Sequence, residues 1–316
     1  SYSVSVVIPN YNGKFLLEKN LPSIFAALKK STNEFEVIVS DDASTDSSVA
    51  FLKEQYLQVK IVLSEINQGF SFTANKGVEV CRMNLVLLLN SDVSLQEDYF
   101  DSLWKYFEDP NTFGVMGSIW SEDGKILMDA AKYPVWKGGQ LKTTINYKVK
   151  ADNTKVLPSL FLSGANALVD RGKLFTLKGF DTRYSPYYME DVDLSVRAWR
   201  SGWNCYYEPK AVCYHKLSET ISAHNSLEKV KFISKRNKFI FHHTHLSGIK
   251  RILWNTENTL NFLFRWLIFD TNYYKIVSEY KKIVRDKQAK TNYPKILDEI
   301  TGKILQATEK LDKELF

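Results

Sequence analysis

The 316-residue chain has few cysteines and no long apolar run. Cys81, Cys205 and Cys213 are odd in number and lack the spacing of a metal site or a CxxC motif, so we expect reduced thiols in a cytosolic protein. No stretch approaches the roughly 20 apolar residues of a membrane span. No signal-peptide pattern is visible, and Ser1 in place of Met indicates a processed or trimmed start. Gly/Ser/Pro-rich linkers, internal repeats and low-complexity tracts are also absent, so only the charge distribution marks a domain boundary.

The composition is that of an ordinary globular chain of one or two domains, with 44% hydrophobic and 25% charged residues. The 17 Tyr, 19 Phe and 7 Trp allow a large core and some surface for stacking or lipid contact. The net charge of +6 is uneven: residues 216–316 have 19 Lys/Arg and 11 Asp/Glu, and the rest of the chain has 23 and 25. We therefore expect one domain at residues 1–216 and a basic extension at residues 217–316.

One expected strand ends in a cluster of polar residues. Residues 85–89 are five consecutive large apolar residues, which is typical of a strand buried on both faces of a parallel sheet. Asn90, Ser91 and Asp92 follow directly. Ligands bind just beyond the carboxyl ends of such strands, where a carboxylate can hold a divalent cation against a phosphate. Taken alone, the segment more often means a strand followed by an ordinary turn.

The first 90 residues alternate between strands and helices. We expect strands at residues 5–8, 35–40, 59–63 and 85–89, with helices near 15–30, 47–56 and 75–81. This alternation predicts right-handed βαβ units and a parallel sheet, and therefore an α/β fold. Polar residues follow three of the strands, at 9–12, 41–42 and 90–92. We expect all three groups to face one cleft.

A second acidic group opens a helix expected near residues 190–201. Three apolar residues share one face of this helix: Val192, Val196 and Trp199. Glu190, Asp191 and Asp193 occupy its first turn, where the helix dipole favours negative charge. For Asp193 the simplest interpretation is dipole compensation together with an i,i+4 ion pair to Arg197. For Asp191 the aromatic residues that precede the helix favour a walled pocket instead.

Seven motifs stand in the order seen in family 2 glycosyltransferases. They are SVVIPNYN (5–12), VSDDASTD (39–46), NQGF with ANKG (67–70, 74–77), LLNSD (88–92), GAN (164–166), GFD (179–181) and MEDVDL (189–194). The resemblance extends from residue 3 to about residue 215, and the chain looks most like the bacterial cell-surface polysaccharide branch that includes rhamnosyltransferases. It implies the GT-A fold, a Rossmann-like nucleotide-binding half fused to an acceptor-binding half. It also implies inverting transfer from a nucleotide sugar to a saccharide or lipid-linked acceptor.

The resemblance further implies roles for single residues. Pro9 and Tyr11 would line the nucleobase pocket, and Asp42 would accept a hydrogen bond from the base. Asp191 would be the catalytic base. The other residues expected to bind the donor are Asn75, Lys76, Ser91, Gly164, Asn166 and Glu190.

The metal site implied by the resemblance is less typical. Asp92 would coordinate the Mn²⁺ or Mg²⁺ ion that bridges the donor diphosphate, with His215 as a second ligand. Many family members have two acids in the triplet that ends at Asp92, whereas here Asn90 takes the first place. Metal binding would then depend mainly on Asp92, His215 and the diphosphate. The histidines at 242–245 are expected at the surface, because zinc sites need more convergent ligands.

The chemistry of sugar transfer requires the same kinds of residue. A base must take the proton of the acceptor hydroxyl, a divalent ion must neutralise the leaving diphosphate, and both substrates must be held in line. A retaining mechanism would need a nucleophile on the opposite face of the sugar, and the sequence offers no candidate for it.

Two other classes of protein fit less well. A sugar nucleotidyltransferase would show a Gly-rich, basic phosphate loop after the first strand, but residues 9–14 contain one glycine. A non-enzymatic nucleic-acid-binding protein would explain the basic tail but not the separate carboxylates of Asp42, Asp92 and Asp191. We therefore expect an enzyme, with no nucleic acid among its partners.

The tail has helical apolar spacing at residues 260–269 and again at 297–315. Two interpretations remain open. These helices can pack against the catalytic domain or against a second subunit in a homodimer. Alternatively, basic and aromatic residues hold a cytoplasmic enzyme peripherally at the inner face of the cell membrane.

Overall fold

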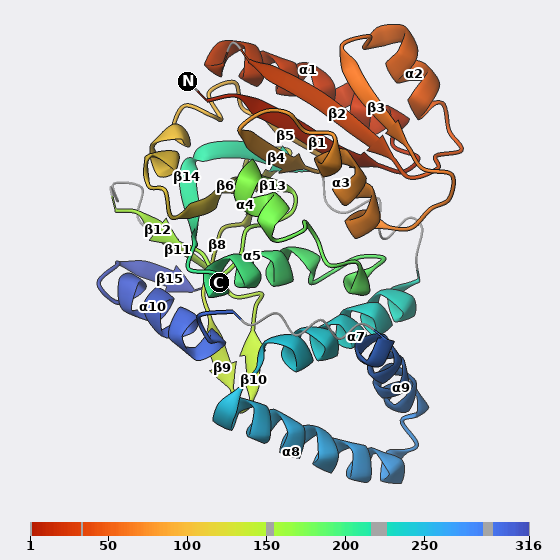
Figure 1. The fold of residues 1–316 in the computed structure, drawn as a ribbon, viewed down its shortest axis with the longest axis vertical. Coiled ribbons are helices and arrows are strands. Elements are labelled where there is room, and N and C mark those ends of the chain that lie inside the picture. Colours follow the sequence, from red (N-terminus) through yellow and green to blue (C-terminus); the bar gives the residue numbers. More distant parts are fainter. Residues whose placement is uncertain (1, 33, 150–154, 216–225, 287–292, 316) are drawn as a thin grey trace.

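The computed structural model describes residues 2–32, 34–149, 155–215, 226–286 and 293–315 (Figure 1). Its first part alternates as expected: β1 (Val4–Asn10), α1 (Lys14–Ser31), β2 (Phe35–Asp41), α2 (Ser48–Gln55), β3 (Val59–Leu63), α3 (Phe70–Glu79) and β4 (Leu85–Leu89). The four predicted strands are confirmed. Helix α3 begins directly after the loop that contains Gly69, because Gly69 adopts a φ of 90° and turns the chain into the helix.

These strands form the parallel half of one mixed sheet. β2 and β4 flank β1, and β3 flanks β2, all in parallel register. Two further strands extend the sheet beyond β4: β13 (Asn166–Asp170), which is antiparallel to both neighbours, and β6 (Thr112–Ser121). The long strand β14 (Asn204–His215) then runs parallel to β6. Short strands complete the edge: β5 (Val93–Leu95) and β12 (Leu157–Pro158) on β14, and β7 (Leu127–Asp129) on β6.

Helices cover both faces of this sheet and form two apolar layers. Along β1 the side chains alternate, so that Val6 and Ile8 pack with α1 while Val7 packs with α3. The face with α3 also carries α5 (Glu190–Arg200), through Val196 and Trp199. All five residues of β4 are buried, as expected for a strand covered on both sides. The predicted α/β architecture is confirmed.

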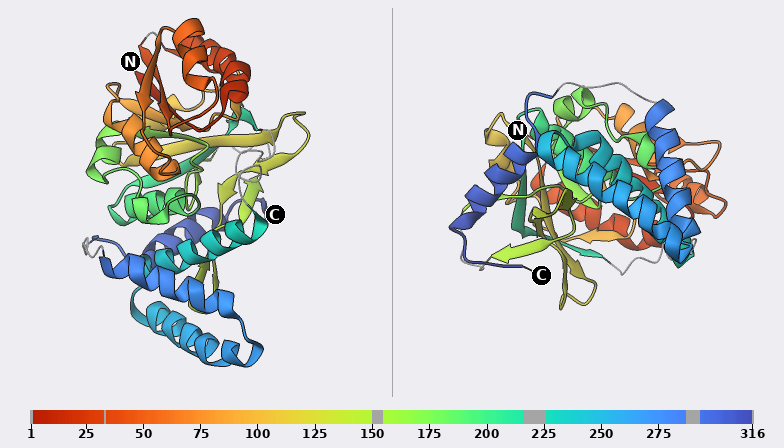
Figure 2. Two further views of the ribbon diagram at one scale, coloured as in Figure 1. Left: turned by 90° about the vertical axis from the view of Figure 1, so that its right-hand side faces the viewer. Right: turned by 90° about the horizontal axis from the view of Figure 1, so that it is seen from below.

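The remaining elements lie between or after these strands. Before α5 they are η1 (Trp104–Glu108), β8 (Ala131–Lys132), β9 (Val135–Lys137), β10 (Gln140–Lys142), β11 (Asn146–Val149), α4 (Arg171–Thr176) and η2 (Thr182–Tyr184). After β14 they are α7 (Leu227–His245), α8 (Gly248–Phe264), η3 (Arg265–Ile268), α9 (Thr271–Asp286), α10 (Leu297–Glu309) and β15 (Lys313–Leu315). Helices α7 to α9 form a layer below α5 (Figure 2), and β15 returns to pair with β11. Within the described residues, no helix combines the length and the apolarity that a bilayer span requires.

The histidine cluster of α7 is buried, which corrects the expectation that it lies at the surface. His242 and His245 are 5% and 1% exposed. Nε2 of His242 accepts the N–H of Leu141 at 3.1 Å, and burial lowers the pKa of His242 to about 4. His245 bonds to Asp193 of α5 at 2.8 Å. The polar residue types of this cluster do not reveal that one face of α7 packs against β10 and α5.

Candidate functional site

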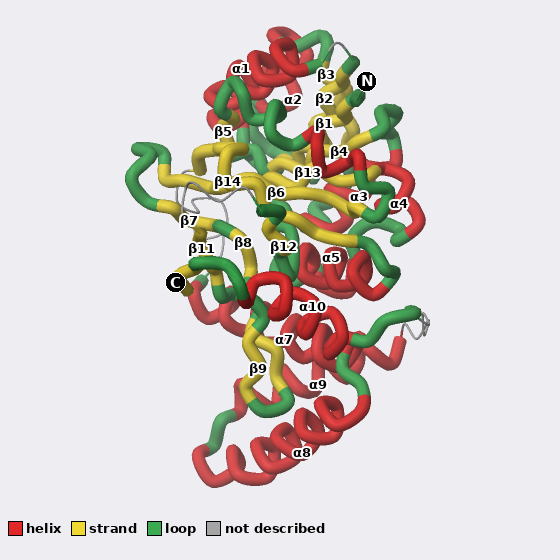
Figure 3. Tube along the Cα trace, turned by 90° about the vertical axis from the view of Figure 1, so that its left-hand side faces the viewer, coloured by secondary structure: helices red, strands yellow, loops and turns green. Residues whose placement is uncertain are grey.

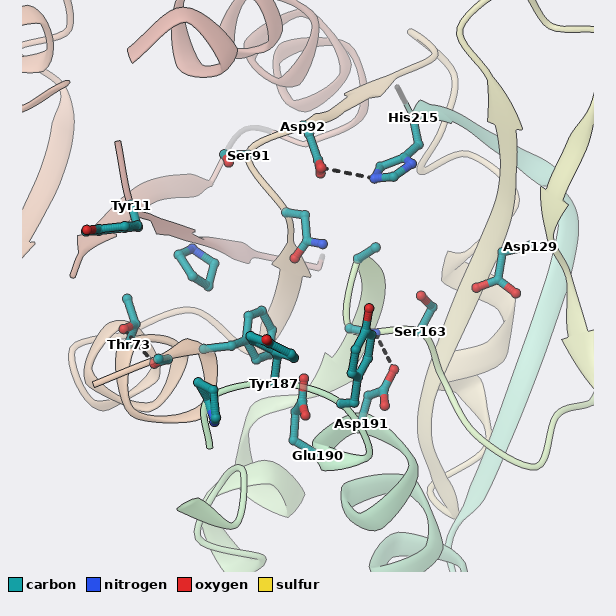
Figure 4. A pocket seen from close by; sticks show the side chains of 18 of the residues that line it. Tyr11, Thr73, Ser91, Asp92, Asp129, Ser163, Tyr187, Glu190, Asp191 and His215 are labelled. Atoms are coloured by element: carbon teal, nitrogen blue, oxygen red, sulfur yellow. Dashed lines mark hydrogen bonds and ion pairs between the residues drawn. The ribbon is translucent and has the colours of Figure 1, made fainter. Parts of the chain in front are cut away.

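A cleft of about 920 Å³ opens where β1, β2 and β4 end (Figure 4). Ligand pockets in proteins commonly measure roughly 300–1,000 Å³. From the parallel half of the sheet the cleft is lined by Pro9, Asn10, Tyr11, Asp42, Asn90, Ser91 and Asp92. From the other half it is lined by Ser163, Gly164, Tyr187, Tyr188, Glu190, Asp191 and His215. The three polar strand ends therefore face one cleft, as the sequence predicts, and the tyrosines form the expected aromatic wall.

Loop backbone holds Asp42 in place at the cleft. Its two carboxylate oxygens accept the N–H groups of Gln68 at 3.0 Å and Gly69 at 2.9 Å. Only glycine fits at position 69, because its φ is 90° and an added Cβ would come within 2.7 Å of the Cα of Pro186. The next residue, Phe70, donates its N–H to the carbonyl of Pro186 at 2.9 Å. The loop before α3 and the loop before α5 thus support each other across the cleft.

Asp92 and His215 meet at one end of the cleft. β5 pairs with the end of β14 so that Val93 lies opposite His215, and Asp92 Oδ2 lies 3.0 Å from His215 Nε2. Burial lowers the pKa of His215, but the hydrogen bond and charge of Asp92 outweigh it and leave the pKa raised. The other oxygen of Asp92, Oδ1, is buried without a partner. A carboxylate oxygen is a suitable ligand for Mn²⁺ and Mg²⁺, and an imidazole nitrogen suits a transition metal such as Mn²⁺ better than it suits Mg²⁺.

Asp92 and His215 fit a metal ion whose remaining ligands come from a bound substrate and water. Among the residues that the structure describes, no three His, Cys, Asp or Glu side chains gather as a metal site. Asn90, in place of a second acid, lines the cleft beside Asp92. Asp92 and His215 would thus leave most coordination positions to phosphate oxygens and water, which is how magnesium is commonly bound at phosphates.

Asp191 and Glu190 lie on the opposite side of the cleft, at the start of α5 (Figure 4). Asp191 accepts the N–H of Gly164 at 3.3 Å and that of Val192 at 2.8 Å. Burial raises the pKa of Asp191, and these two donors offset only part of the shift. Burial also raises the pKa of Glu190 to about 8, with the neighbouring charge of Asp191 adding to the shift. Because the two carboxyl groups are buried side by side, ionisation of one opposes ionisation of the other.

Asp193, two residues farther along α5, belongs to the core. Its carboxylate bonds to Arg197 at 2.6 Å, to His245 at 2.8 Å and to the hydroxyl of Tyr184 at 3.1 Å. Burial raises its pKa, but the charge of Arg197 and the bonds from Arg197 and His245 bring the pKa well below the usual range. The predicted ion pair with Arg197 is confirmed.

Helix α7 holds the loop that precedes Glu190. Tyr188 and Met189 in this loop have φ values of 74° and 75°, a region that residues other than glycine rarely adopt. The buried Nδ2 of Asn237 donates to the carbonyls of Tyr184 at 2.6 Å, Tyr187 at 2.9 Å and Tyr188 at 2.8 Å. The strained backbone that aims Asp191 at the cleft is thus fixed by a residue of the tail.

Three residues assigned to donor binding from the sequence do not line the cleft. Asn75 bonds through its side chain to the backbone of Phe180, at 2.8 Å to both N and O. Lys76 donates to Ser64 Oγ at 2.9 Å. Asn166 is fully buried in β13, where its Nδ2 lies 3.2 Å from Cys213 Sγ. These three side chains support the elements around the cleft.

Other residues that line the cleft escaped sequence reading. Asp129 and Lys132 form an ion pair beside Asp191, and Lys132 Nζ also bonds to Asn146 Oδ1 at 2.6 Å. The charges of Lys132 and Asp129 act on the pKa of Asp191 in opposite directions. Asp129, Lys132 and Asn146 belong to β7, β8 and β11, respectively. These strands have two to four residues, too few for a periodic pattern in the sequence. Lys229, in the first turn of α7, also lines the cleft.

Comparison with known proteins identifies the family. The model of glycosyl transferase family 2 matches residues 5–175, more than half of the chain. A curated relative in Mycobacterium tuberculosis, N-acetylglucosaminyl-diphospho-decaprenol L-rhamnosyltransferase, is 27% identical over 239 residues, which cover 68% of this chain and 76% of the relative. Chondroitin synthase of Escherichia coli is 33% identical over 98 residues, covering 30% of this chain and 14% of the synthase.

Solved structures show the same fold at low identity. GalNAc-T7, solved with UDP, GalNAc and Mn²⁺, matches 98% of this chain and 58% of its own, with a TM-score of 0.66 and 16% identity. A mannosyltransferase from Pyrobaculum calidifontis, in complex with GDP-Man and Mn²⁺, matches 91% of this chain and 88% of its own, with a TM-score of 0.56 and 16% identity. The fold is therefore GT-A, and the resemblance read from the seven motifs is confirmed. The chain belongs to glycosyl transferase family 2.

Proposed function

We propose that this enzyme is an inverting glycosyltransferase that moves a sugar from a nucleotide-diphosphate donor to a hydroxyl of a saccharide or lipid-linked saccharide. The supporting observation is that one cleft contains the Asp92–His215 pair at one side and the buried Asp191–Glu190 pair at the other. The Mycobacterium tuberculosis relative is named for a decaprenol-linked acceptor. We extend that acceptor class to the present chain, and with it a role in cell-surface polysaccharide synthesis.

The nucleotide-binding half would hold the donor. Pro9, Tyr11 and Ser91 line the cleft on that side, and Asp42 is fixed there by two backbone N–H groups, so a lone pair remains on each of its oxygens for the base. Asp92 and His215 would hold a divalent cation against the diphosphate. That ion would act as a Lewis acid and neutralise the charge of the leaving nucleoside diphosphate.

Asp191 would take the proton of the acceptor hydroxyl. Burial raises the pKa of both Asp191 and Glu190, and the two N–H groups that Asp191 accepts favour its ionised form, so Asp191 would carry the charge of the pair and Glu190 the proton. A raised pKa makes the Asp191 carboxylate a stronger base. The protonated Glu190, whose Oε2 is buried without a partner, can donate a hydrogen bond to a sugar hydroxyl. Gly164 supports the base through its backbone N–H.

Residues 1–216 would form the catalytic domain and residues 217–316 an extension packed on it through α7, α10 and β15. We propose that the enzyme works on the cytoplasmic side, held peripherally at the membrane that contains its acceptor. Two observations support a role of the extension in the site: Asn237 bonds to the loop before Glu190, and Lys229 lines the cleft. A homodimer through the same helices is the competing arrangement.

The test combines nucleotide binding with transfer. A thermal-shift panel of nucleotide sugars with Mn²⁺ or Mg²⁺ should identify the donor, because a ligand of the native state stabilises it by mass action. With that donor, Asp191→Asn should lower transfer by about 10²–10⁴-fold and leave the nucleotide-induced shift unchanged. Asp101→Asn, at an exposed residue bonded to Ser31, is the matched control and should transfer normally. Transfer that persists in Asp191→Asn but is lost in Glu190→Gln would contradict the assignment of the base.

A further inference from the structure

Helix α8 lies at the end of the molecule farthest from α1 and α2 (Figures 1 and 3), and it carries an exposed apolar surface. Helix α8 is the outermost element there. Its exposed apolar residues are Ile249, Ile252, Leu253, Leu260, Phe262, Leu263 and Phe264. Residues 266–269 continue the run, with Trp266 68% and Phe269 82% exposed. Together these residues are called the α8–η3 surface.

Most of the exposed apolar residues of α8 form one stripe along the helix. At 100° per residue, all of them except Phe262 fall within a sector of about 120°. Trp254 lies on the other side of α8, where it is buried against Phe239 and Tyr280. The helix therefore already has its core contact, and the outward stripe is an additional apolar face. Isolated exposed apolar residues are common, but a contiguous patch of this kind marks an interaction site.

Several polar side chains near this stripe bond within the protein. The hydroxyls of Thr256 and Thr259 donate to carbonyls one turn earlier in α8, at 3.0 and 2.9 Å. The single acid of α8, Glu257, turns inward and accepts the N–H of Gly139 at 3.0 Å. Arg265, the one charge inside the apolar run, pairs with Asp270 and stacks over Tyr273 at 4.7 Å. Hydroxyls that bond to their own helix and charges that turn inward suit a hydrocarbon environment.

Basic residues outnumber acidic ones in the helices that carry and adjoin the α8–η3 surface. Residues 226–286 contain 12 Lys/Arg and 5 Asp/Glu. Lys281 of α9 lies 5.8 Å from the ring centroid of Phe262. Lys275 and Lys282 of α9 and Lys235 of α7 are exposed as well. An apolar stripe with Trp and Phe, bordered by lysines, matches the interfacial region of an anionic lipid bilayer.

We propose that the α8–η3 surface binds an anionic membrane, with its apolar side chains in the interfacial layer and the lysines against lipid phosphates. This inference rests on the proposed function in one respect: a lipid-linked acceptor would explain why the enzyme binds a membrane. Helix α7 joins the surface to the cleft: Lys229 at its start lines the cleft, and α8 follows its end. A membrane bound by α8 therefore lies on the side of the molecule that carries α5 and Asp191.

The test is flotation of the full chain with vesicles of phosphatidylcholine alone or mixed with phosphatidylglycerol. The variant combines Leu263→Glu with Trp266→Glu, both at exposed positions. The control combines Leu57→Glu with Ile66→Glu, which are 85% and 66% exposed in the nucleotide-binding half. We expect the wild type and the control to float with anionic vesicles at low salt. The vesicle-bound fraction of the Leu263/Trp266 variant should be lower than that of the wild type by about tenfold or more.

Two further measurements keep the outcomes separate. Circular dichroism and the donor-induced thermal shift should be equal in all three proteins, which shows that the variant is folded and that the nucleotide site is intact. A wild type that stays in solution with anionic vesicles would overturn the proposal without touching the proposed chemistry. The proposal would also be overturned if the wild type elutes as a dimer and the Leu263→Glu, Trp266→Glu variant elutes as a monomer. The α8–η3 surface would then bind a second copy of the chain.

Discussion

Asn237 should control catalysis from outside the cleft. Its Nδ2 donates to three carbonyls of the loop before Glu190, through a buried bond to Tyr184 and partly buried bonds to Tyr187 and Tyr188, so Asn237→Ala removes this donor from all three. Each buried group left unsatisfied costs about 1–3 kcal/mol. We expect a loss of about 2–4 kcal/mol in the free energy of unfolding, because Arg236 still bonds to the carbonyl of Ser185.

The loss of Asn237 should also appear in the kinetics. Tyr188 and Met189 have positive φ values that persist only under restraint. Once the loop relaxes, Asp191 moves relative to the acceptor, and a displacement of about 1 Å can cost about 10²-fold in rate. We expect kcat to fall by about 10- to 100-fold, with the dissociation constant of the nucleotide unchanged.

Kinetics of transfer and urea denaturation measure both effects. Asn258→Ala is the matched control, because its Nδ2 makes one bond, to the Trp254 carbonyl at 2.8 Å within α8. That variant should keep wild-type kcat. If Asn237→Ala is destabilised but transfers sugar at the wild-type kcat, the residue supports the fold and does not position Asp191.

Two further predictions concern the charged groups of the cleft. Burial raises the pKa of Glu190 to about 8, so this group makes the wild type lose stability as the pH rises from about 4.5 to 8, and Glu190→Gln should flatten that part of the stability curve measured by urea denaturation. An equal slope in both proteins would show that Glu190 ionises normally. For the metal site, EDTA should abolish transfer, and Asp92→Ala should remove the Mn²⁺-dependent part of nucleotide binding in calorimetry while leaving the metal-free part. Full transfer in EDTA would contradict a metal at Asp92 and His215.

The sequence predicts the parallel half of the fold well because its signals are local. β1 to β4 are short apolar runs that end in polar turns, and a parallel sheet buried on both faces requires such runs. The sequence also predicts the acidic start of α5, because this signal is local as well. It does not predict Asp129 or Lys132, which reach the cleft from strands too short to show a period.

Periodicity also fails to say what covers an apolar helix face. The expected face of α10 is buried, with Ile300 and Ile304 at 2% and 0% exposure, whereas the equivalent face of α8 is open to solvent. The motif around Asn166 was read as one donor-binding unit, yet only Gly164 and Ala165 of it line the cleft. Asn166 begins β13 and turns into the sheet. Such outcomes depend on tertiary contacts between residues distant in the sequence.

The central claim is that Asp191 activates the acceptor for direct displacement of the nucleoside diphosphate. The most direct measurement is NMR of the product anomer formed by the wild type with Mn²⁺ and the donor identified by thermal shift, with Asp191→Asn assayed beside it. The account predicts a glycosidic bond of configuration opposite to that of the donor, and a loss of product in Asp191→Asn. A product that retains the configuration of the donor, or an Asp191→Asn enzyme that forms it at the wild-type rate, would contradict the claim.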